Sequence, residues 1–364
     1  MKIVFAVEHF RPYVGGVEQL FGSLADALVA QGHEVVVVTS RYRPDLHKIE
    51  ISGKLKILRT GRNRFWFTFL SVFSLLREAK HTDLVHTTSY NAALPAWLAA
   101  RLCRKPVVVT FHEFWGKLWF TLPYMNRFQR PLFYLFEQLL IRLNFNVFVG
   151  VSNHTTTMLL RNTRKEVIRI YNGLNYNEFA ERGSNKTNTA FTFAFFGRAG
   201  SSKGLDMLLP AAEEYMDLDS EARFCLIVPR HNTDAFIHTE RMINSFRHKE
   251  RLEVFHHLDR SAVFEKIQQA DCVVIPSYNE GFCFAAAEAV ALGIPVISSG
   301  RGALPEVVSG KFIHLSSLGI PQLVDALHRA KQGMWQEKPN VQFHLDDTVK
   351  EYLELYKQTI LIKP

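Results

Sequence analysis

The chain has 364 residues, of which 47% are hydrophobic and 21% are charged, and its formal net charge is +8. This composition excludes a disordered chain, and the length is sufficient for two domains. The excess of positive charge predicts an anionic partner, which could be nucleic acid, a phosphorylated ligand or an acidic membrane surface. The first apolar run is short and no stretch of 18 uncharged apolar residues occurs, so we expect neither a secretory signal nor a membrane span.

The cysteines point to a reducing environment. The four residues show no CxxC or other metal-ligand spacing, and three of them lie in apolar, strand-like segments. We therefore expect buried thiols without disulfides, and a cytoplasmic location. The residues are Cys103, Cys225, Cys272 and Cys283.

The first half of the sequence alternates short apolar strands with helices. This pattern predicts βαβ units and a parallel sheet. Strands are predicted at 2–7, 33–40, 83–89, 106–112 and 146–152, and helices at 15–32 and 91–104.

A polar stretch at 182–190, "RGSNKTNTA", interrupts the pattern and predicts a linker, after which the alternation starts again. We expect an α/β fold of two Rossmann-like, doubly wound domains, 1–182 and 190–343, facing each other across a central cleft. A last helix within 344–364 would pack back on the first domain. The second domain's strands are predicted at 191–197, 222–228, 251–256, 272–277 and 295–299, with helices at 203–216 and 285–292.

Two glutamates eight positions apart, Glu280 and Glu288, frame the start of the helix predicted at 285–292. A rise of about 1.5 Å per residue puts them about 12 Å apart along a helix axis. That separation exceeds the carboxyl spacing of both retaining and inverting glycosidases. It fits two ends of one elongated ligand with a helix N-terminus between them.

Three further segments carry candidate chemistry. Gly15 and Gly16 open the first helix and either let backbone N–H groups approach an anion or form a plain tight turn. Arg198 and Lys203 flank a Gly/Ser loop that suits a diphosphate, or that is a solvated basic loop. His112 ends a buried strand, where histidine can be catalytic or structural.

Taken in order, the motifs resemble a known family. They are "GGVE", "FHE", "VS", "NG", GRxxxxKG, and E-x7-E followed by "GIPVISSGRGALPEVV". This set resembles the retaining glycosyltransferases of family 4, with the GT-B fold, over nearly the whole chain. The resemblance implies transfer of a hexose-type sugar from a UDP- or GDP-sugar to a glycan hydroxyl, with retention of configuration and no metal or other cofactor. The leaving phosphate oxygen would take the proton of the acceptor hydroxyl.

The resemblance also implies roles for single residues. Gly15 and Gly16 would contact the donor phosphate, and His112 would lie beside the transferred sugar. Arg198 and Lys203 would bind the diphosphate and stabilise the leaving group. Glu280 would hold hydroxyls of the sugar, and Glu288 would hold the ribose. The donor site would also include Gly281, Phe282, Cys283, Phe284 and Ala285.

The sequence departs from the family pattern at three positions. Cys283 stands where the family usually has glycine. Pro229 and His257 replace glycines near the expected base pocket, so the identity of the nucleotide base stays open.

The acceptor is suggested by two segments, 62–80 and 117–145, which mix Phe, Trp and Leu with Arg and Lys. Such segments suit an anionic membrane surface, although packing in a domain core would also explain their apolar residues. We expect a lipid-linked acceptor or a growing polysaccharide or lipopolysaccharide, and a peripheral position on the inner face of the cell membrane.

Two alternatives belong to other classes. A nucleic-acid-binding protein would use the net charge of +8, but the basic residues are scattered and form no recognisable nucleic-acid motif. A sugar-nucleotide epimerase or a phosphorylase could share the architecture. A phosphorylase would need a pyridoxal-phosphate lysine, and no such site is identifiable in the sequence.

Overall fold

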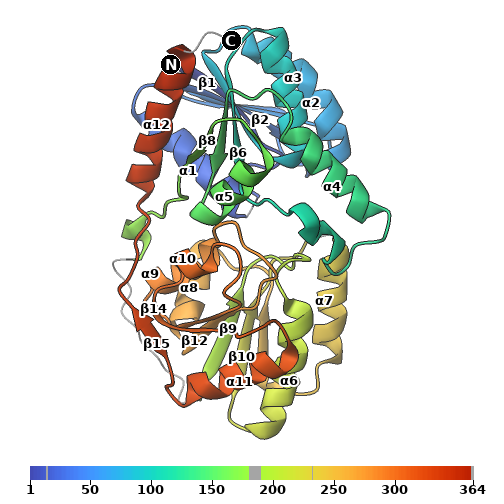
Figure 1. Ribbon diagram of the computed structural model, residues 1–364, viewed down its shortest axis with the longest axis vertical. Coiled ribbons are helices and arrows are strands. Elements are labelled where there is room, and N and C mark those ends of the chain that lie inside the picture. Colours follow the sequence, from blue (N-terminus) through green and yellow to red (C-terminus); the bar gives the residue numbers. More distant parts are fainter. Residues whose placement is uncertain (14, 180–189, 232, 362–364) are drawn as a thin grey trace. The chain divides into compact units, whose positions relative to one another are not determined.

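The computed structural model describes residues 1–13, 15–179, 190–231 and 233–361. The predicted linker 182–190 therefore lies outside the described residues, except for Ala190. Contacts divide the chain into two compact α/β units (Figure 1). The first unit is Met1–Trp119, Phe128–Gly173 and Phe343–Pro364, and the second is Phe120–Arg127 and Leu174–Gln342.

The first unit contains an eight-stranded sheet in the order β3-β4-β2-β1-β5-β6-β7-β8. All neighbours are parallel except β3 and β4, which form an antiparallel pair at one edge. The predicted strands are all present, while this hairpin and β8 were not predicted. The strands are β1 (Lys2–Ala6), β2 (Glu34–Ser40), β3 (Ile49–Ser52), β4 (Leu55–Thr60), β5 (Leu84–Thr88), β6 (Val107–Phe111), β7 (Val147–Gly150) and β8 (Val167–Arg169).

The helices of the first unit bury one face each against this sheet or against one another. Both predicted helices are confirmed, with slightly shorter bounds. The helices are α1 (Gly16–Ala30), α2 (Arg64–Ala79), α3 (Ala93–Leu102), α4 (Gln129–Leu140), α5 (Asn153–Asn162) and α12 (Leu345–Leu361), with 3₁₀ turns η1 (Tyr90–Ala92) and η2 (Gly116–Phe120).

The second unit contains a seven-stranded sheet in the order β11-β10-β9-β12-β13-β14-β15, parallel except for β14 and β15. Its strands are β9 (Thr192–Phe196), β10 (Arg223–Ile227), β11 (Leu252–Phe255), β12 (Cys272–Ile275), β13 (Val296–Ser298), β14 (Gly310–His314) and β15 (Gln336–Lys338). Its helices are α6 (Leu205–Leu218), α7 (Asp234–Ser245), α8 (Arg260–Gln268), α9 (Phe284–Ala291), α10 (Leu304–Val307) and α11 (Ile320–Lys331), with η3 (Tyr176–Glu178) and η4 (Lys249–Arg251).

Each sheet reverses its strand order once, which makes both units doubly wound as predicted. In the first unit the reversal lies between β1 and β5, and in the second between β9 and β12. Such switch points, at the carboxyl ends of the strands, are where open α/β sheets bind ligands. The predicted diphosphate loop follows β9, and the predicted E-x7-E segment follows β12.

The last helix, α12, belongs to the first unit, where it packs against α1 and β5. Two of its tyrosines are fully buried and make hydrogen bonds to the sheet. The Tyr356 hydroxyl lies 2.6 Å from His86 Nδ1, and the Tyr352 hydroxyl lies 3.0 Å from Thr110 Oγ1. His86 Nε2 lies 2.8 Å from the same Thr110 oxygen, which closes a buried polar network. The helix is therefore tied to the sheet by specific polar contacts as well as by apolar packing.

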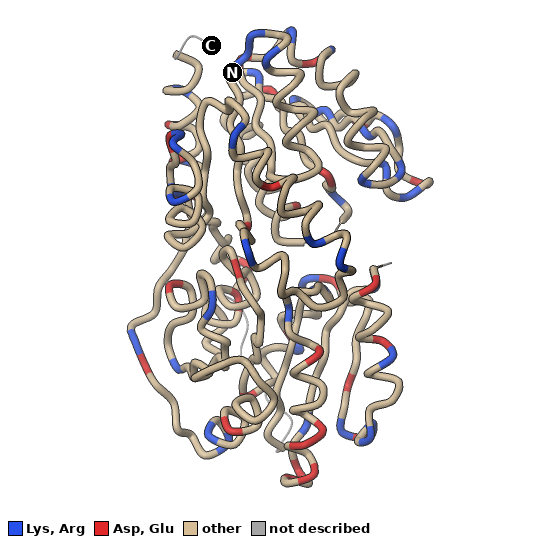
Figure 2. The backbone as a smooth tube through the Cα atoms, turned by 45° about the vertical axis from the view of Figure 1, so that its right-hand side comes forward, with Lys and Arg blue, Asp and Glu red and all other residues tan. Residues whose placement is uncertain are grey.

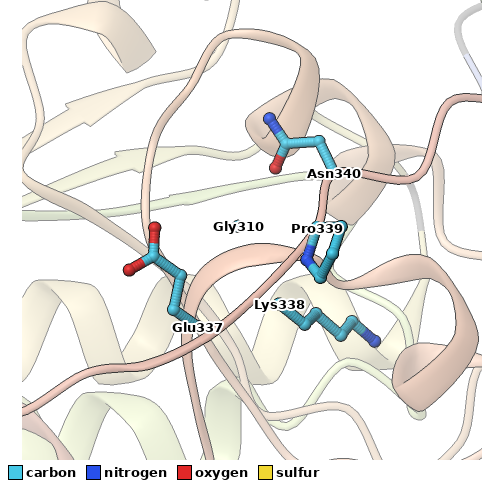
Figure 3. Close-up of a pocket in the computed structure, with 5 residues that line it drawn as sticks. All are labelled: Gly310, Glu337, Lys338, Pro339 and Asn340. Atoms are coloured by element: carbon cyan, nitrogen blue, oxygen red, sulfur yellow. The ribbon is translucent and has the colours of Figure 1, made fainter.

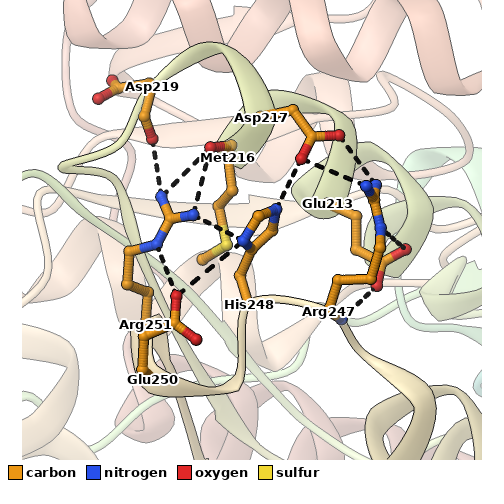
Figure 4. Close-up of polar contacts among 8 residues, drawn as sticks. All are labelled: Glu213, Met216, Asp217, Asp219, Arg247, His248, Glu250 and Arg251. Atoms are coloured by element: carbon orange, nitrogen blue, oxygen red, sulfur yellow. Dashed lines mark hydrogen bonds and ion pairs between the residues drawn. The ribbon is translucent and has the colours of Figure 1, made fainter.

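An ionic cluster in the second unit holds the segment before β11 against the end of α6 (Figure 4). Arg251 donates to the backbone oxygens of Met216 and Asp219, at 3.3 and 2.9 Å. Arg247 and His248 both contact the carboxylate of Asp217. Cations are favourable at a helix C-terminus, because the last carbonyls carry partial negative charge. The cluster therefore explains how β11 is positioned, and it contains none of the predicted site residues.

Candidate functional site

The segments after β9 and β12 form the centre of the candidate site in the second unit. We call residues 197–204 and 276–283 the switch-point loops. The backbone N–H of Tyr278 donates to the Ser202 oxygen at 2.7 Å. Gly204 has φ +71°, and a Cβ there would lie 2.2 Å from the Pro276 oxygen. Only glycine fits this position, so the motif glycine allows the two loops to lie in contact.

This contact brings together two predicted site residues, Lys203 and Glu280. The Lys203 ammonium donates to both carboxylate oxygens of Glu280, at 2.8 and 3.0 Å. Ser277 Oγ donates to the same carboxylate at 2.6 Å. The Glu280 carboxylate is buried, whereas Arg198, in the same loop as Lys203, is exposed. The site thus presents a fixed carboxylate and a neighbouring ammonium. The carboxylate can accept hydrogen bonds from sugar hydroxyls, and the ammonium can donate hydrogen bonds to phosphate oxygens.

A third segment closes over the backbone of Glu280. The N–H of Ala303 donates to the Glu280 oxygen at 2.8 Å. Gly302 has φ +67°, and a Cβ there would lie 2.2 Å from that same oxygen. The glycine of "SGRGALPEVV" therefore has a direct role in positioning Glu280.

Asn279 is a site residue that the sequence did not reveal. It is 3% exposed, and its Nδ2 has no hydrogen-bond partner among the described residues. Buried donors are nearly always paired, so a ligand oxygen is a reasonable partner for this amide. Its only signal in the sequence is its position next to Glu280.

The N-terminus of α9 carries the other predicted donor residues. Cys283 precedes the helix with φ +76°, in the left-handed region that favours glycine. This conformation is a physical reason for glycine at the position, and nothing in the structure explains why Cys283 replaces it here. Phe284 and Ala285 begin α9, so their N–H groups have no acceptor within the helix. Such N–H groups and the helix dipole favour an anion.

Glu288 lies one turn further along α9 and is bound by an arginine that the sequence did not predict. Arg260 contacts Glu288 Oε1 through NH1 at 2.8 Å, and its Nε donates to Glu178. Its guanidinium also lies 4.6 Å from the centre of the Phe264 ring. Burial raises the pKa of Glu288 above its ordinary value, and the adjacent Arg260 partly opposes this rise. Nothing in the spacing of the sequence joins Arg260 to Glu178 or Glu288, because the three residues come from α8, η3 and α9.

In the first unit, Gly15 and Gly16 lie at the start of α1. Gly15 has an extended backbone, with φ −179°, so no left-handed conformation explains it. A Cβ at Gly15 would instead lie 2.2 Å from Glu18 Oε2, and Glu18 is buried. Glycine at this position leaves room for the Glu18 carboxylate, which would have to move to accept a larger residue.

His112 directly follows β6, at the carboxyl edge of the first sheet. Its Nε2 is buried and has no hydrogen-bond partner among the described residues, although the residue as a whole is half-buried. Burial lowers the pKa of His112 to about 3, so the imidazole is neutral near pH 7. Phe21 lies next to its ring, with centroids 6.2 Å apart. A neutral ring with an unused nitrogen can bond a ligand hydroxyl.

The loop after His112 is held by a buried carboxylate that the sequence did not predict. Glu137, on α4, accepts hydrogen bonds from the N–H groups of Trp115 and Gly116, at 2.9 and 2.6 Å. It also accepts from the Tyr90 hydroxyl at 2.9 Å. Burial raises the pKa of Glu137. The loop beside His112 is thus fixed to the inner face of α4.

Other features of the described residues lie away from these motifs. A pocket along β14 and β15 is lined by Gly310, Glu337, Lys338, Pro339 and Asn340, none of which was predicted as a site residue (Figure 3). Among the residues that the structure describes, no cluster of His, Cys, Asp and Glu is arranged to hold a metal ion. Nor does any helix in the described part of the chain have the length and apolar character to cross a membrane. Basic residues are spread over many elements of both units (Figure 2).

Comparisons with known proteins agree with the motifs. Residues 14–178 match the model of Glycosyltransferase Family 4, and residues 177–357 match that of Glycosyl transferases group 1. Over 344 residues the chain is 24% identical to one component of the phosphatidylinositol N-acetylglucosaminyltransferase of Arabidopsis thaliana, covering 91% of this chain and 74% of that protein.

Solved structures share the fold at low sequence identity. Sucrose-phosphate synthase from Thermosynechococcus elongatus superimposes with a TM-score of 0.79 and 18% identity, covering 98% of each chain. The Anabaena protein HepE, in complex with UDP and glucose, gives a TM-score of 0.73 and 16% identity, covering 98% of this chain and 99% of that one. Each unit of the present chain therefore has its counterpart in proteins of the GT-B fold.

Proposed function

The chain belongs to the family 4 and group 1 glycosyltransferases of the GT-B fold, and from this we propose that it transfers a hexose-type sugar from a UDP- or GDP-sugar to a hydroxyl of a glycan acceptor, with retention of configuration. That it is a glycosyltransferase follows from the family. The donor, the stereochemistry and the acceptor are the parts that we propose.

The observation that carries the proposal is the paired arrangement around α9. Glu280 is buried before the helix and is bound to Lys203, while Glu288 is buried within it and is bound to Arg260. Between them lie the first N–H groups of α9. A nucleotide sugar would place its sugar hydroxyls at Glu280, its diphosphate over the helix N-terminus, and its ribose at Glu288.

The chemistry assigned to this chain is charge compensation. As the bond between sugar and diphosphate breaks, negative charge grows on the departing phosphate oxygens. Arg198, Lys203 and the N–H groups of Phe284 and Ala285 would stabilise that charge in a site that is arranged in advance. We propose that no divalent metal is needed for this step. The phosphate oxygen would accept the proton of the acceptor hydroxyl, so that neither glutamate acts as the base.

In the second unit, Asn279 Nδ2 would donate to a sugar hydroxyl beside Glu280. For His112, in the first unit, we keep the role beside the transferred sugar that the family resemblance implies, and its neutral ring can bond a hydroxyl. Gly15 and Gly16, at the start of α1, would approach the donor phosphate. Positioning of this kind accounts for a large share of the rate enhancement in transfer reactions.

The acceptor is proposed to be lipid-linked. The name of the Arabidopsis relative couples an N-acetylglucosaminyltransferase with phosphatidylinositol, which is a lipid. The apolar and basic segments 62–80 and 117–145 of this chain agree with an acceptor at a membrane. With it we propose a peripheral position on the inner face of the cell membrane.

The decisive experiment is a donor panel. The protein is incubated with UDP-, GDP- and ADP-sugars, and slow donor hydrolysis is followed by release of the nucleoside diphosphate. We expect one nucleotide class to be hydrolysed, unchanged activity after addition of a chelator, and a product with the donor's anomeric configuration by NMR. A Glu280→Gln variant serves as the inactive control. Hydrolysis of none of the donors, or equal hydrolysis by the variant, would overturn the proposal.

A further inference from the structure

The outer faces of α2 and α4 expose large apolar side chains to solvent. The exposed fraction of these side chains runs from 41% at Leu70 to 73% at Phe128. We call this set the apolar face. It consists of Phe65, Trp66, Phe69, Leu70 and Phe73 on α2, and of Phe128, Leu132, Leu135 and Leu139 at the start of α4 and along it.

These residues follow the helical period, so each set forms a stripe. On α2 the stripe repeats at Phe65, Phe69 and Phe73, four positions apart. The opposite side of α2 supplies the buried Phe67 and Leu75. A helix that is apolar on its buried side and again on its outer side has a second surface to cover. Packing in the domain core therefore does not account for the apolar face.

The two helices are linked through the same short turn, η1, to which both make hydrogen bonds. Thr68 of α2 donates to the Asn91 oxygen at 3.2 Å. The Tyr90 hydroxyl donates to Glu137 of α4 at 2.9 Å. Figure 1 shows α2, α3 and α4 on one side of the first unit. The two stripes thus belong to one region of that unit.

The charges on these helices have a single sign at the surface. Within 62–80 and 128–145 the only acidic residues are Glu78 and Glu137, and both are buried. Glu78 is bound by Lys56 at 2.8 Å, and Glu137 by the loop beside His112. The exposed charges at the helix ends are all basic: Arg62, Arg64, Arg77, Lys80 and Arg142.

We propose that the apolar face is a docking surface for an anionic lipid bilayer. Aromatic and leucine side chains would enter the boundary between headgroups and acyl chains, while the surrounding Arg and Lys would bind anionic headgroups. A second copy of this chain fits the face less well, because pairing two such faces would bring like charges together. Docking itself needs no donor and no catalysis. The docking proposal rests on the proposed function and extends it, because a bilayer bound at the apolar face would hold the lipid-linked acceptor.

The inner side of α4 relates this surface to the candidate site. Glu137, on the buried side of α4, holds the N–H groups of Trp115 and Gly116, a few residues after His112. Leu135 and Leu139, on the outer side of the same helix, belong to the apolar face. One helix therefore presents residues to the bilayer and fixes the loop beside His112.

The test is co-sedimentation of the full chain with vesicles of phosphatidylcholine alone and of phosphatidylcholine mixed with phosphatidylglycerol. We expect binding to the mixed vesicles and release by added salt, since exposed charges are screened within about 8 Å at physiological ionic strength. A Phe69→Ser/Phe73→Ser variant should lower the partition coefficient about tenfold or more. Arg77→Glu/Lys80→Glu should lower binding to the mixed vesicles only. Leu218→Ser on α6, an equally exposed apolar residue of the second unit (75%), is the matched control and should bind as the parent does.

The outcomes are separable. Equal binding by the parent and the Phe69→Ser/Phe73→Ser variant, or binding independent of lipid charge and salt, would overturn the proposal. So would a parent that ignores vesicles but forms a dimer that this variant abolishes, which would assign the face to a second copy. Unchanged melting temperatures show that the variants are folded. Because donor hydrolysis is measured in solution without vesicles, failure of docking and failure of the proposed function are distinguishable.

Discussion

Lys203 and Glu280, 77 positions apart in the sequence, form an ion pair in which the ammonium contacts both carboxylate oxygens. The Glu280 side chain is 3% exposed and that of Lys203 is 25% exposed. Arg198 lies in the same loop as Lys203 but is exposed. The two cations of the GRxxxxKG motif are therefore not equivalent: one compensates a buried carboxylate, whereas the other lies at the surface.

This difference predicts separate effects of replacing the two cations. Arg198→Ala should lower kcat about a hundredfold, the loss of one charge-assisted contact in the transition state. It should lower the melting temperature less than Lys203→Ala does, because Arg198 is exposed. Lys203→Ala should lower kcat as well, and should also lower the free energy of unfolding by about 2 kcal/mol, because the Glu280 carboxylate stays buried without its cation. Steady-state kinetics at saturating donor and urea unfolding measure the two effects.

A double variant tests the cause of the stability loss. In Lys203→Ala/Glu280→Gln the buried carboxylate is replaced by a neutral amide, so stability should return towards that of the parent while turnover stays low. If Lys203→Ala unfolds like the parent and turns over at the parent rate, the pair is only a surface contact.

The two glutamates should differ in what they bind. Glu288→Ala should lower the affinity for a nucleoside diphosphate and for its nucleotide sugar by the same factor, about tenfold or more, because both ligands carry the ribose. Glu280→Gln, the matched control at the other end of the site, should lower only the affinity for the nucleotide sugar. Isothermal titration with both ligands checks this. If Glu288→Ala binds the nucleoside diphosphate as tightly as the parent does, Glu288 does not bind the ribose.

Gly204 and Gly293 give a matched pair for the contact between the switch-point loops. Both have left-handed backbones, with φ +71° and +72°. A Cβ at Gly204 meets the Pro276 oxygen at 2.2 Å, whereas at Gly293 it meets nothing within 4 Å. Gly293→Ala should cost about 1–2 kcal/mol of unfolding free energy, and Gly204→Ala about 2–4 kcal/mol. Gly204→Ala should also abolish donor binding. Equal costs for both variants would show that the loops separate without penalty.

Acid should destabilise the first unit through His86. Burial lowers the pKa of His86 to about 3, against an ordinary value of 6.5. Above pH 6.5 the ring is neutral in both states and has no effect. Below it the unfolded chain takes up a proton and the folded chain does not, so stability falls towards pH 3 by about 1.4 kcal/mol per pH unit. Urea unfolding at pH 7.5 and pH 5 should show this loss.

His86→Gln is the control, since an amide can still bond Thr110 and Tyr356 but does not titrate. Its loss of stability between the two pH values should be smaller than the parent's by about 2 kcal/mol. His112, whose pKa is also lowered to about 3 by burial, contributes to the remaining slope. An identical loss in parent and variant would show that His86 is protonated within the folded protein.

The sequence was sufficient for the parallel strands, because each is a short apolar run between turn signals. It did not predict the β3–β4 hairpin, since Ile49, Glu50 and Lys56 lie in a mixed segment at the sheet edge, where one side faces solvent. Motif spacing singled out Lys203 and Glu280 separately. Their direct contact could not be predicted, because it depends on how closely Gly204 approaches Pro276.

The residues that the sequence did not predict as part of the site share one property. Arg260, Asn279 and Glu137 belong to no spaced motif, and what marks each of them, a distant partner or burial, depends on the fold. Arg260 reaches Glu288 from another helix, and Glu137 reaches the backbone of Trp115 and Gly116 from α4. Asn279 stands out only because burial leaves its amide without a partner among the described residues. Contacts between distant segments, and burial, are what a single sequence conceals.

The residues His86 and Tyr356, which are in contact, lie 270 positions apart in the sequence. The contact can therefore form only after the segments between them have been translated. Strand β5 precedes most of the second unit in the chain, whereas the helix that covers it, α12, follows that unit. Until then the surface that α12 covers on α1 and β5 stays open, while the whole second unit is translated. Synthesis of the first unit therefore begins before that of the second unit and is completed after it. A nascent chain stalled before residue 345 would expose His86 and the apolar surface around it, and exposed apolar surface of this kind favours aggregation.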